Sequence, residues 1–222
     1  MLRYCYMTST LLIPGYAVGI HASIFRQPFG EHGGFVGLDA EVKRGEAKAF
    51  RWCKNISLSM VQSANPWHYY QLYRDEEALA ESSATQSALY NFITAENPST
   101  IICHSLGCRL MIGAMNTYGI PESISKIIFL QGDAPTSISI TNTAVLDRLA
   151  NKTFIIENYH CPWDQSLLAS MMLHRKIRIG LTGWKQIGVK NVFHPLLKPM
   201  NLHTSPLRDR KFAKKLHETM DN

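Results

Sequence analysis

A serine placed between a predicted strand and a predicted helix constrains the fold of this chain most strongly. Residues Thr100–His104 are β-branched or apolar apart from the last, which is typical of a buried strand. Ser105 follows at once, and Gly107–Tyr118 has the character of a helix. A strand that turns directly into a helix leaves little room at the turn, so the residues two positions before and after the serine must be small. Gly107 meets this requirement, and Cys103 is somewhat larger than the glycine usual at its position.

The same alternation of short apolar runs and helical segments extends along the chain, which predicts an α/β fold with a mostly parallel sheet. The expected strands are Thr10–Ile13, Ala47–Trp52, Thr100–His104, Lys126–Gln131 and Thr153–Glu157. The expected helices are Glu76–Ala95, Gly107–Tyr118, Thr143–Ala150, Gln165–Leu173 and Asp209–Met220. With 222 residues, 45% of them hydrophobic, the chain suits a single domain over residues 1–222 with its own core.

Two segments interrupt the alternation. Residues 19–45 carry six glycines, which indicates a long irregular loop. Residues 57–74 crowd aromatic side chains behind Pro66. Both segments are candidates for loops that line a pocket or form a lid, and the aromatic cluster could equally be the packed underside of a helix.

Cysteine usage and hydropathy predict a cytoplasmic protein. The five cysteines are scattered and form no CxxC pair, which speaks against a zinc ribbon or a disulfide framework. No apolar run reaches the roughly 18–20 residues of a membrane helix, so stable membrane insertion is not expected. The N-terminus lacks the small-residue cleavage site of a secretory signal.

The net charge of +6 is unevenly placed, since no acidic residue lies between Asp164 and Asp209. Such a basic stretch favours an anionic substrate or a membrane surface, or it is simply a solvated face. No ribonucleoprotein motif and no zinc-finger spacing occurs, so nucleic acid is not an expected partner.

Three features together resemble the α/β-hydrolase superfamily, in particular its compact serine esterase and lipase-like members. They are the Pro14-Gly15-Tyr16 turn after a strand, the His104-Ser105-Leu106-Gly107 turn between a strand and a helix, and a later Asp and His. The resemblance implies a three-layer sandwich whose mostly parallel sheet lacks some N-terminal strands of the full fold. Cys103 and Pro14 depart from the superfamily's usual glycine and histidine at these positions.

The resemblance implies that Ser105 is a nucleophile, and the turn indicates how an oxyanion would be stabilised. The backbone N–H of Leu106 lies at the start of a helix, where the helix dipole favours negative charge. The second donor is expected from the loop after the first strand, and the backbone N–H of Tyr16 is the candidate.

The superfamily's chain order places an acid and then a histidine after the serine. Asp164 is favoured as the acid over Asp133, although each follows a predicted strand. The order excludes the four histidines before Ser105 as the base. His203 is favoured because it lies in a loop just before the last predicted helix, and His194 is its main rival. The remaining histidines after the serine are His160, His174 and His217.

A serine hydrolase that cleaves a small-molecule acyl ester or thioester through an acyl-enzyme is the expected function. No metal ion and no organic cofactor is implied. Acyl transfer, amide hydrolysis and a peripheral lipase activity remain open, because a fold does not fix the chemistry of its site. The alternative from another class is a non-catalytic domain of the same fold that binds a partner or a small ligand. The oligomeric state is not predicted.

Overall fold

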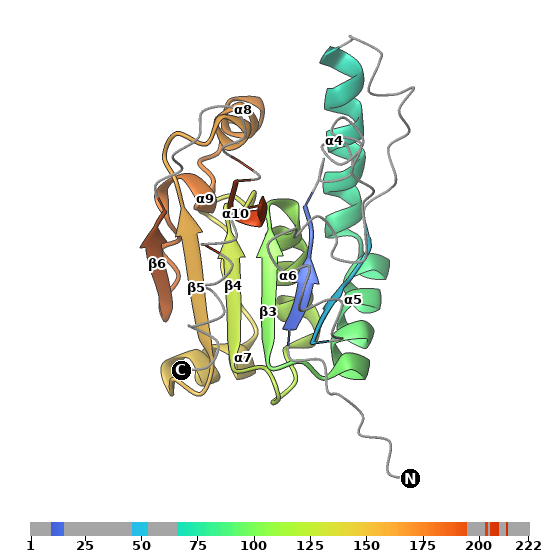
Figure 1. Ribbon diagram of the computed structural model, residues 1–222, viewed down its shortest axis with the longest axis vertical. Coiled ribbons are helices and arrows are strands. Elements are labelled where there is room, and N and C mark those ends of the chain that lie inside the picture. The colour runs from blue at the N-terminus through green and yellow to red at the C-terminus, as the bar shows by residue number, and fades with distance from the viewer. Residues whose placement is uncertain are drawn as a thin grey trace.

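The computed structural model describes residues 10–15, 46–52, 66–194, 203, 205–208 and 212. Strands between residues 10 and 193 join one sheet in the order β2-β1-β3-β4-β5-β6, and all neighbours are parallel (Figure 1). This confirms the α/β class expected from the sequence. The strands are β1 Thr10–Ile13, β2 Ala47–Ala49, β3 Thr100–His104, β4 Lys126–Leu130, β5 Ile155–His160 and β6 Val189–Phe193.

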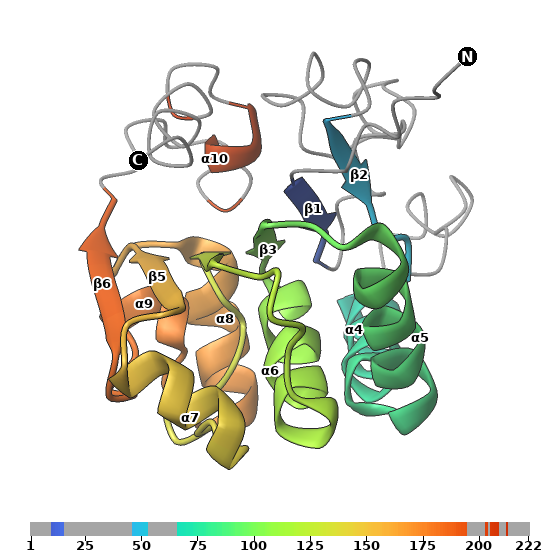
Figure 2. The ribbon, with the colours of Figure 1, turned by 90° about the horizontal axis from the view of Figure 1, so that it is seen from below.

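The helices alternate with these strands and divide unequally between the two faces of the sheet. They are α4 Pro66–Glu81, α5 Ser83–Glu96, α6 Leu106–Tyr118, α7 Thr143–Ala150, α8 Gln165–His174, α9 Ile179–Thr182 and α10 Ser205–Arg208. Helices α4 to α9 lie on one side of the sheet, and α10 lies on the other (Figure 2). From β2 to β6 the chain crosses the sheet in a single direction, and right-handed crossovers in one direction place their helices on one face.

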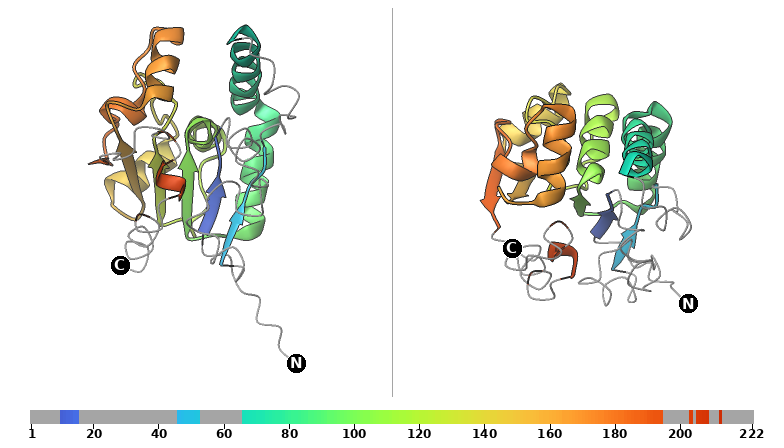
Figure 3. Two further views of the ribbon diagram at one scale, coloured as in Figure 1. Left: turned by 45° about the horizontal axis from the view of Figure 1, so that its top comes forward. Right: turned by 90° about the horizontal axis from the view of Figure 1, so that it is seen from above.

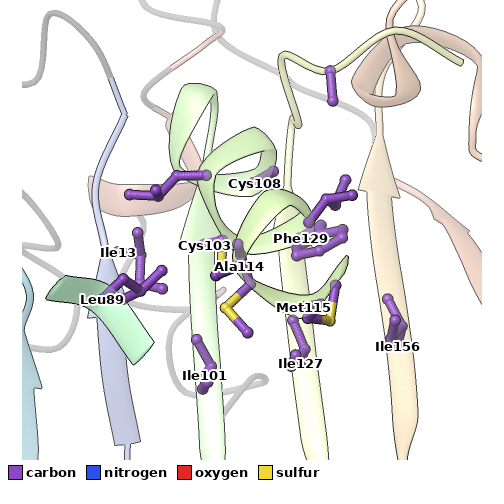
Figure 4. Close-up of a cluster of buried hydrophobic side chains, with 14 of the residues drawn as sticks. Ile13, Leu89, Ile101, Cys103, Cys108, Ala114, Met115, Ile127, Phe129 and Ile156 are labelled. Carbon is purple, nitrogen blue, oxygen red and sulfur yellow. The ribbon is translucent and has the colours of Figure 1, made fainter. Parts of the chain in front are cut away.

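The central strands are buried on both faces, which explains their continuous apolar runs. Ile13, Cys103 and Phe129 lie side by side in register and face the helical layer, where they pack near α6 (Figure 4). The residues that alternate with them point to the opposite face. There Leu12, Ile102 and Ile128 form a second apolar cluster with others, closed by Leu207 and Phe212 from the C-terminal part of the chain.

The expected helix over Glu76–Ala95 is two helices, α4 and α5, seen end to end in Figure 3. The break lies at Ser82, whose hydroxyl accepts a hydrogen bond from the Thr85 backbone N–H at 3.2 Å and so caps α5. Helix α4 begins at Pro66, a residue suited to the first turn of a helix. Of the two interpretations left open for residues 57–74, a loop and a helix, residues 66–74 follow the helix, and residues 57–65 and 19–45 lie outside the described residues.

Strand β6 and helix α9 were not expected from the sequence. Strand β6 is the edge of the sheet, and its residues are exposed or only partly buried, with Lys190 and Asn191 at its centre. An edge strand has one open side and tolerates polar residues, so it lacks the apolar run that identifies a central strand. None of the described helices is long and apolar enough to cross a membrane.

The topology also fixes where a site is to be sought. From β1 the chain moves to β2 on one side, and from β3 it moves to β4 on the other. Ligand sites of parallel sheets lie at such a switch point, beside the carboxyl ends of the two strands. Gly15 lies just after β1 and Ser105 lies just after β3, so both are at this switch point.

Candidate active site

Ser105 lies in a strained turn at the carboxyl end of β3. Its backbone has φ 54° and ψ −124°, a conformation that residues with a side chain rarely adopt. Helix α6 begins at the next residue, and Ser105 is its N-cap without a capping bond from its own side chain. Strain of this kind costs on the order of 1–3 kcal/mol and persists only where the surroundings enforce it. The turn leaves the serine hydroxyl available to another partner.

Two glycines allow the chain to pack closely enough to form this turn. A Cβ on Gly107 would lie 2.5 Å from the carbonyl oxygen of Ile13, and a Cβ on Gly15 would lie 2.6 Å from the carbonyl oxygen of His104. Both obstacles are backbone atoms, which cannot swing aside. The predicted need for a small residue at position 107 is confirmed, whereas Cys103, two residues before the serine, fits within the buried core.

Trp52 holds the loop after β1 against this turn, a role that the sequence did not reveal. Its indole Nε1–H donates a 2.8 Å hydrogen bond to the carbonyl oxygen of Pro14. The ring is buried in the core on the helical face. Because a Cβ on Gly107 would also lie 2.7 Å from that carbonyl oxygen, Trp52 fixes one wall of the narrow space around the turn.

The structure brings the three favoured residues together in one chain of hydrogen bonds. The Nε2 atom of His203 lies 2.8 Å from the Oγ atom of Ser105, and its Nδ1 atom lies 2.8 Å from the Oδ2 atom of Asp164. A carboxylate only accepts, so Nδ1 carries the proton of a neutral ring and Nε2 accepts from the serine hydroxyl. This is the tautomer that a base for Ser105 requires.

The two carboxylate oxygens of Asp164 bind different parts of the protein. Oδ1 accepts hydrogen bonds from the backbone N–H groups of Ser166 and Leu167, which caps α8, and Oδ2 accepts from His203. The side chain is fully buried. Burial alone would raise the pKa of Asp164, but the charge and hydrogen bond of His203 outweigh it and hold that pKa below its ordinary value. The carboxylate therefore stays ionised beside the imidazole.

His203 is held from two sides. Burial alone would lower the pKa of its imidazole, but the charge of Asp164 and the hydrogen bond to it outweigh burial and raise that pKa above 6.5. From the other side, the Nε2 atom of His104 lies 2.7 Å from the backbone carbonyl oxygen of His203, so His104 donates this bond. Chain order excluded His104 as a base, and the structure gives it a contact with the backbone of His203 instead.

The pleat of β3 explains why His104 reaches His203. Cys103 faces the helical layer, and Ile102 faces the second apolar cluster. Side chains of a strand alternate, so His104 points to the same face as Ile102. That face is covered by the C-terminal part of the chain that carries His203 and Leu207.

Asp133, the other candidate acid, is engaged elsewhere. Its carboxylate forms an ion pair with Arg178, with Nε and Oδ1 3.2 Å apart, and accepts hydrogen bonds of 2.8 Å from Tyr73 and Ser170. Burial and the Asp133 charge raise the pKa of Tyr73, so its hydroxyl stays protonated and donates. The backbone N–H of Asp133 also donates to the carbonyl oxygen of Ser105 at 3.0 Å. Asp133 thus ties α4, α8 and the segment before α9 to the serine turn.

Of the two candidate oxyanion donors, only Leu106 lies in the described part of the chain. Its backbone nitrogen is at the N-terminus of α6, and a Cβ on Gly15 would lie 3.1 Å from it, so the loop after β1 passes directly beside it. Tyr16, the other candidate, lies outside the described residues.

The rival histidines that the structure describes contact residues other than Ser105. His194 directly follows β6, and its ring centroid lies 4.3 Å from that of Phe212. His174 lies near Tyr73 and 3.6 Å from Glu77, and His160 ends β5. His217 lies outside the described residues.

Ser105, His203 and an ionised Asp164 therefore lie in one hydrogen-bonded chain beside the N-terminus of α6. Among the residues that the structure describes, no group of three or more His, Cys, Asp or Glu side chains could hold a metal ion. Comparison of the chain with family models, curated proteins and solved structures gives no match.

We expect Gly107→Ala to lower stability by about 1–3 kcal/mol, because the added methyl group collides with the backbone of Ile13 and overpacking carries costs of this size. Urea unfolding followed by circular dichroism measures the change. Gly113→Ala is the matched control on the same helix, since its methyl group meets only the flexible end of Gln86. Equal losses in the two variants would contradict the steric account of the turn.

Proposed function

We propose that this chain is a serine hydrolase that cleaves acyl esters or thioesters, with Ser105 as nucleophile, His203 as base and Asp164 as orienting acid. The observation that carries the proposal is the hydrogen-bond chain from Ser105 through His203 to Asp164, with both distances 2.8 Å. It starts from a serine in a strained turn at the switch point of a parallel sheet. These are the geometric roles by which such triads are recognised on unrelated folds.

We further propose that the fold is an α/β-hydrolase fold that lacks some N-terminal strands. Support comes from the order of the three residues along the chain and from the strand–turn–helix setting of Ser105. The acid follows β5 and the base follows β6, each at the carboxyl edge where the serine lies. A layer of helices on one face, and α10 with Phe212 on the other, agrees with the proposed three-layer sandwich.

In this mechanism the proton of the Ser105 hydroxyl passes to Nε2 of His203 as Oγ attacks the acyl carbonyl carbon. The oxyanion forms beside the backbone N–H of Leu106 and the candidate donor Tyr16. The bond to the leaving group then breaks, and the leaving group takes the proton from Nε2. Water, deprotonated by His203, hydrolyses the acyl-serine and returns the hydroxyl to Ser105. Asp164 stabilises the imidazolium in both halves of the reaction.

We expect a fluorophosphonate probe to label the wild-type protein at Ser105, because the attack on phosphorus needs the same activated hydroxyl. Ser105→Ala should abolish labelling, and His203→Ala should slow it by roughly 10³-fold or more, as loss of a triad member does. Mass spectrometry locates the adduct. Ser137→Ala and His194→Ala are the matched controls and should label normally. Folded wild-type protein that stays unlabelled would contradict the proposal and favour the non-catalytic binding domain.

The pH profile of kcat/KM on a short ester should show an acid limb with an apparent pKa above 6.5. Only neutral His203 accepts the serine proton, so activity is present above the pKa of that imidazole and is lost as pH falls through it. Asp164→Asn removes the charge that raises this pKa. The limb should move to lower pH, and kcat should fall by roughly 10⁴-fold because the imidazole loses its orienting partner. A limb at unchanged pH in Asp164→Asn would contradict the assignment of the acid.

His104 acts in this proposal as a positioning residue, because it holds the backbone of His203 and not the reacting atoms. His104→Phe keeps a ring but loses the donor, and we expect kcat to fall by roughly 10- to 100-fold with KM nearly unchanged, since small misplacements of a catalytic group cost this much. His104→Gln keeps an N–H donor and should recover part of the loss. Equal stability of the two variants in thermal unfolding, with different kcat values, separates positioning from folding; equal kcat values would contradict it.

A further inference from the structure

Large exposed hydrophobic side chains gather on the side of the molecule that carries Ser105. Among the described residues, six of the eight such side chains belong to segments at the carboxyl ends of the strands. They are Trp67, Trp163, Met172, Leu173, Ile177 and Phe193. The two others, Ile155 and Ile187, begin or precede strands and so lie at the opposite edge. Isolated exposed hydrophobic side chains are ordinary, but such a one-sided distribution indicates a surface that binds an apolar partner.

The densest part of this surface is the end of α8, which we call the α8 tip and define as Met172, Leu173, Arg175, Lys176 and Ile177. All five residues are exposed. Met172 is 72% exposed. Helix α8 packs its other face against the protein, and this packing does not require a large apolar side chain to be so exposed. Helix α8 lies beyond the carboxyl ends of the strands, as does the start of α4 (Figures 1 and 3).

The charge of the α8 tip is positive and is not balanced within its own segment. Arg175 and Lys176 stand between the apolar residues, and no acidic residue occurs between Asp164 and Asp209. Among the described residues, the acidic groups that face α8 are Asp133, paired with Arg178, and Glu77, which lies 3.6 Å from His174. Glu77 is buried and already forms ion pairs with Arg74 and Arg109. Its charge is therefore matched by other cations.

We propose that the α8 tip docks on a lipid surface that carries anionic headgroups. Apolar side chains that enter the headgroup region beside cations that pair with anionic lipids are the chemistry of peripheral membrane binding. Complementary charge favours an anionic membrane over a neutral apolar partner. The docking itself does not depend on the proposed function. Its consequence does rest on that function, and it is that the ester cleaved by Ser105 belongs to a lipid in that surface.

The position of the tip relative to the triad gives the docking this consequence. Asp164 is the N-cap of α8 and holds His203, so the triad lies at the beginning of the helix whose end carries the tip. A helix of ten residues is about 15 Å long, which is less than half the thickness of a bilayer. A lipid in a surface bound at the tip can therefore reach the site.

Vesicle co-sedimentation tests the docking without hydrolysis, using the full chain with Ser105→Ala. We expect binding to vesicles of phosphatidylcholine with 30% phosphatidylglycerol, and binding at least roughly 10-fold weaker to phosphatidylcholine alone or at 0.5 M salt, since surface attraction is screened. Met172→Ser with Leu173→Ser, and separately Arg175→Gln with Lys176→Gln, should each lower the partition coefficient roughly 10-fold. The matched controls at the opposite edge, Ile187→Ser and Lys152→Gln, should bind as the parent does.

Failure of the docking and failure of the proposed function give different results. A parent protein that stays in the supernatant with anionic vesicles, or opposite-edge controls that lose binding as the tip variants do, would overturn the docking. Tip variants made with Ser105 intact should hydrolyse a dissolved short ester at the wild-type rate while they lose activity on vesicle lipids. Vesicle binding without any labelling of Ser105 would overturn the hydrolase proposal and leave the docking in place.

Discussion

The narrow space around Ser105 is the constraint on which the rest of the site depends. The carbonyl oxygens of Ile13 and His104 lie so close to Gly107 and Gly15 that neither glycine can carry a Cβ without displacing backbone. Because strand, loop and helix meet at this distance, Ser105 is forced to positive φ and cannot cap α6 with its own hydroxyl. The hydroxyl is instead within hydrogen-bond reach of His203, and the first N–H groups of α6 face the same place. The strained turn thus places the hydroxyl of the buried Ser105 beside both His203 and the positive end of α6.

Two buried carboxylates lie at the carboxyl edge of the sheet, and their partners decide what each can do. Asp133 is surrounded by Arg178, Tyr73 and Ser170, so its oxygens are already used in holding helices to the sheet. One oxygen of Asp164 caps the N-terminus of α8, and the other accepts the hydrogen bond from His203. Its cap makes the carboxylate rigid, and a rigid carboxylate orients an imidazole better than a mobile one. Stability of α8 and orientation of the His203 imidazole therefore depend on the same side chain.

Much of this arrangement follows from local sequence pattern. Strand β3 matches its prediction at both ends because it is buried on both faces, and the turn at Ser105 follows from small residues in the right places. The structure also brings together the serine, the aspartate and the histidine that chain order favoured. Strand β6 was not predicted because edge strands carry polar residues. The sequence also did not show that Asp133 pairs with Arg178, which lies 45 residues further along the chain. The contact of His104 was not predicted either, because it is made with a backbone carbonyl that no side-chain pattern marks.

The division of the molecule into two faces explains how His203 reaches Ser105. One-directional crossovers place α4 to α9 on one face, so the packing of α6 positions Ser105 from that side. Leu207 and Phe212 pack on the other face, where they anchor the segment that carries His203. The even-numbered residues of β3 point to this second face, and His104, the last of them, donates to the backbone of His203 directly beside the serine. Ser105 and His203 are therefore held from opposite faces of the sheet and meet at the end of β3.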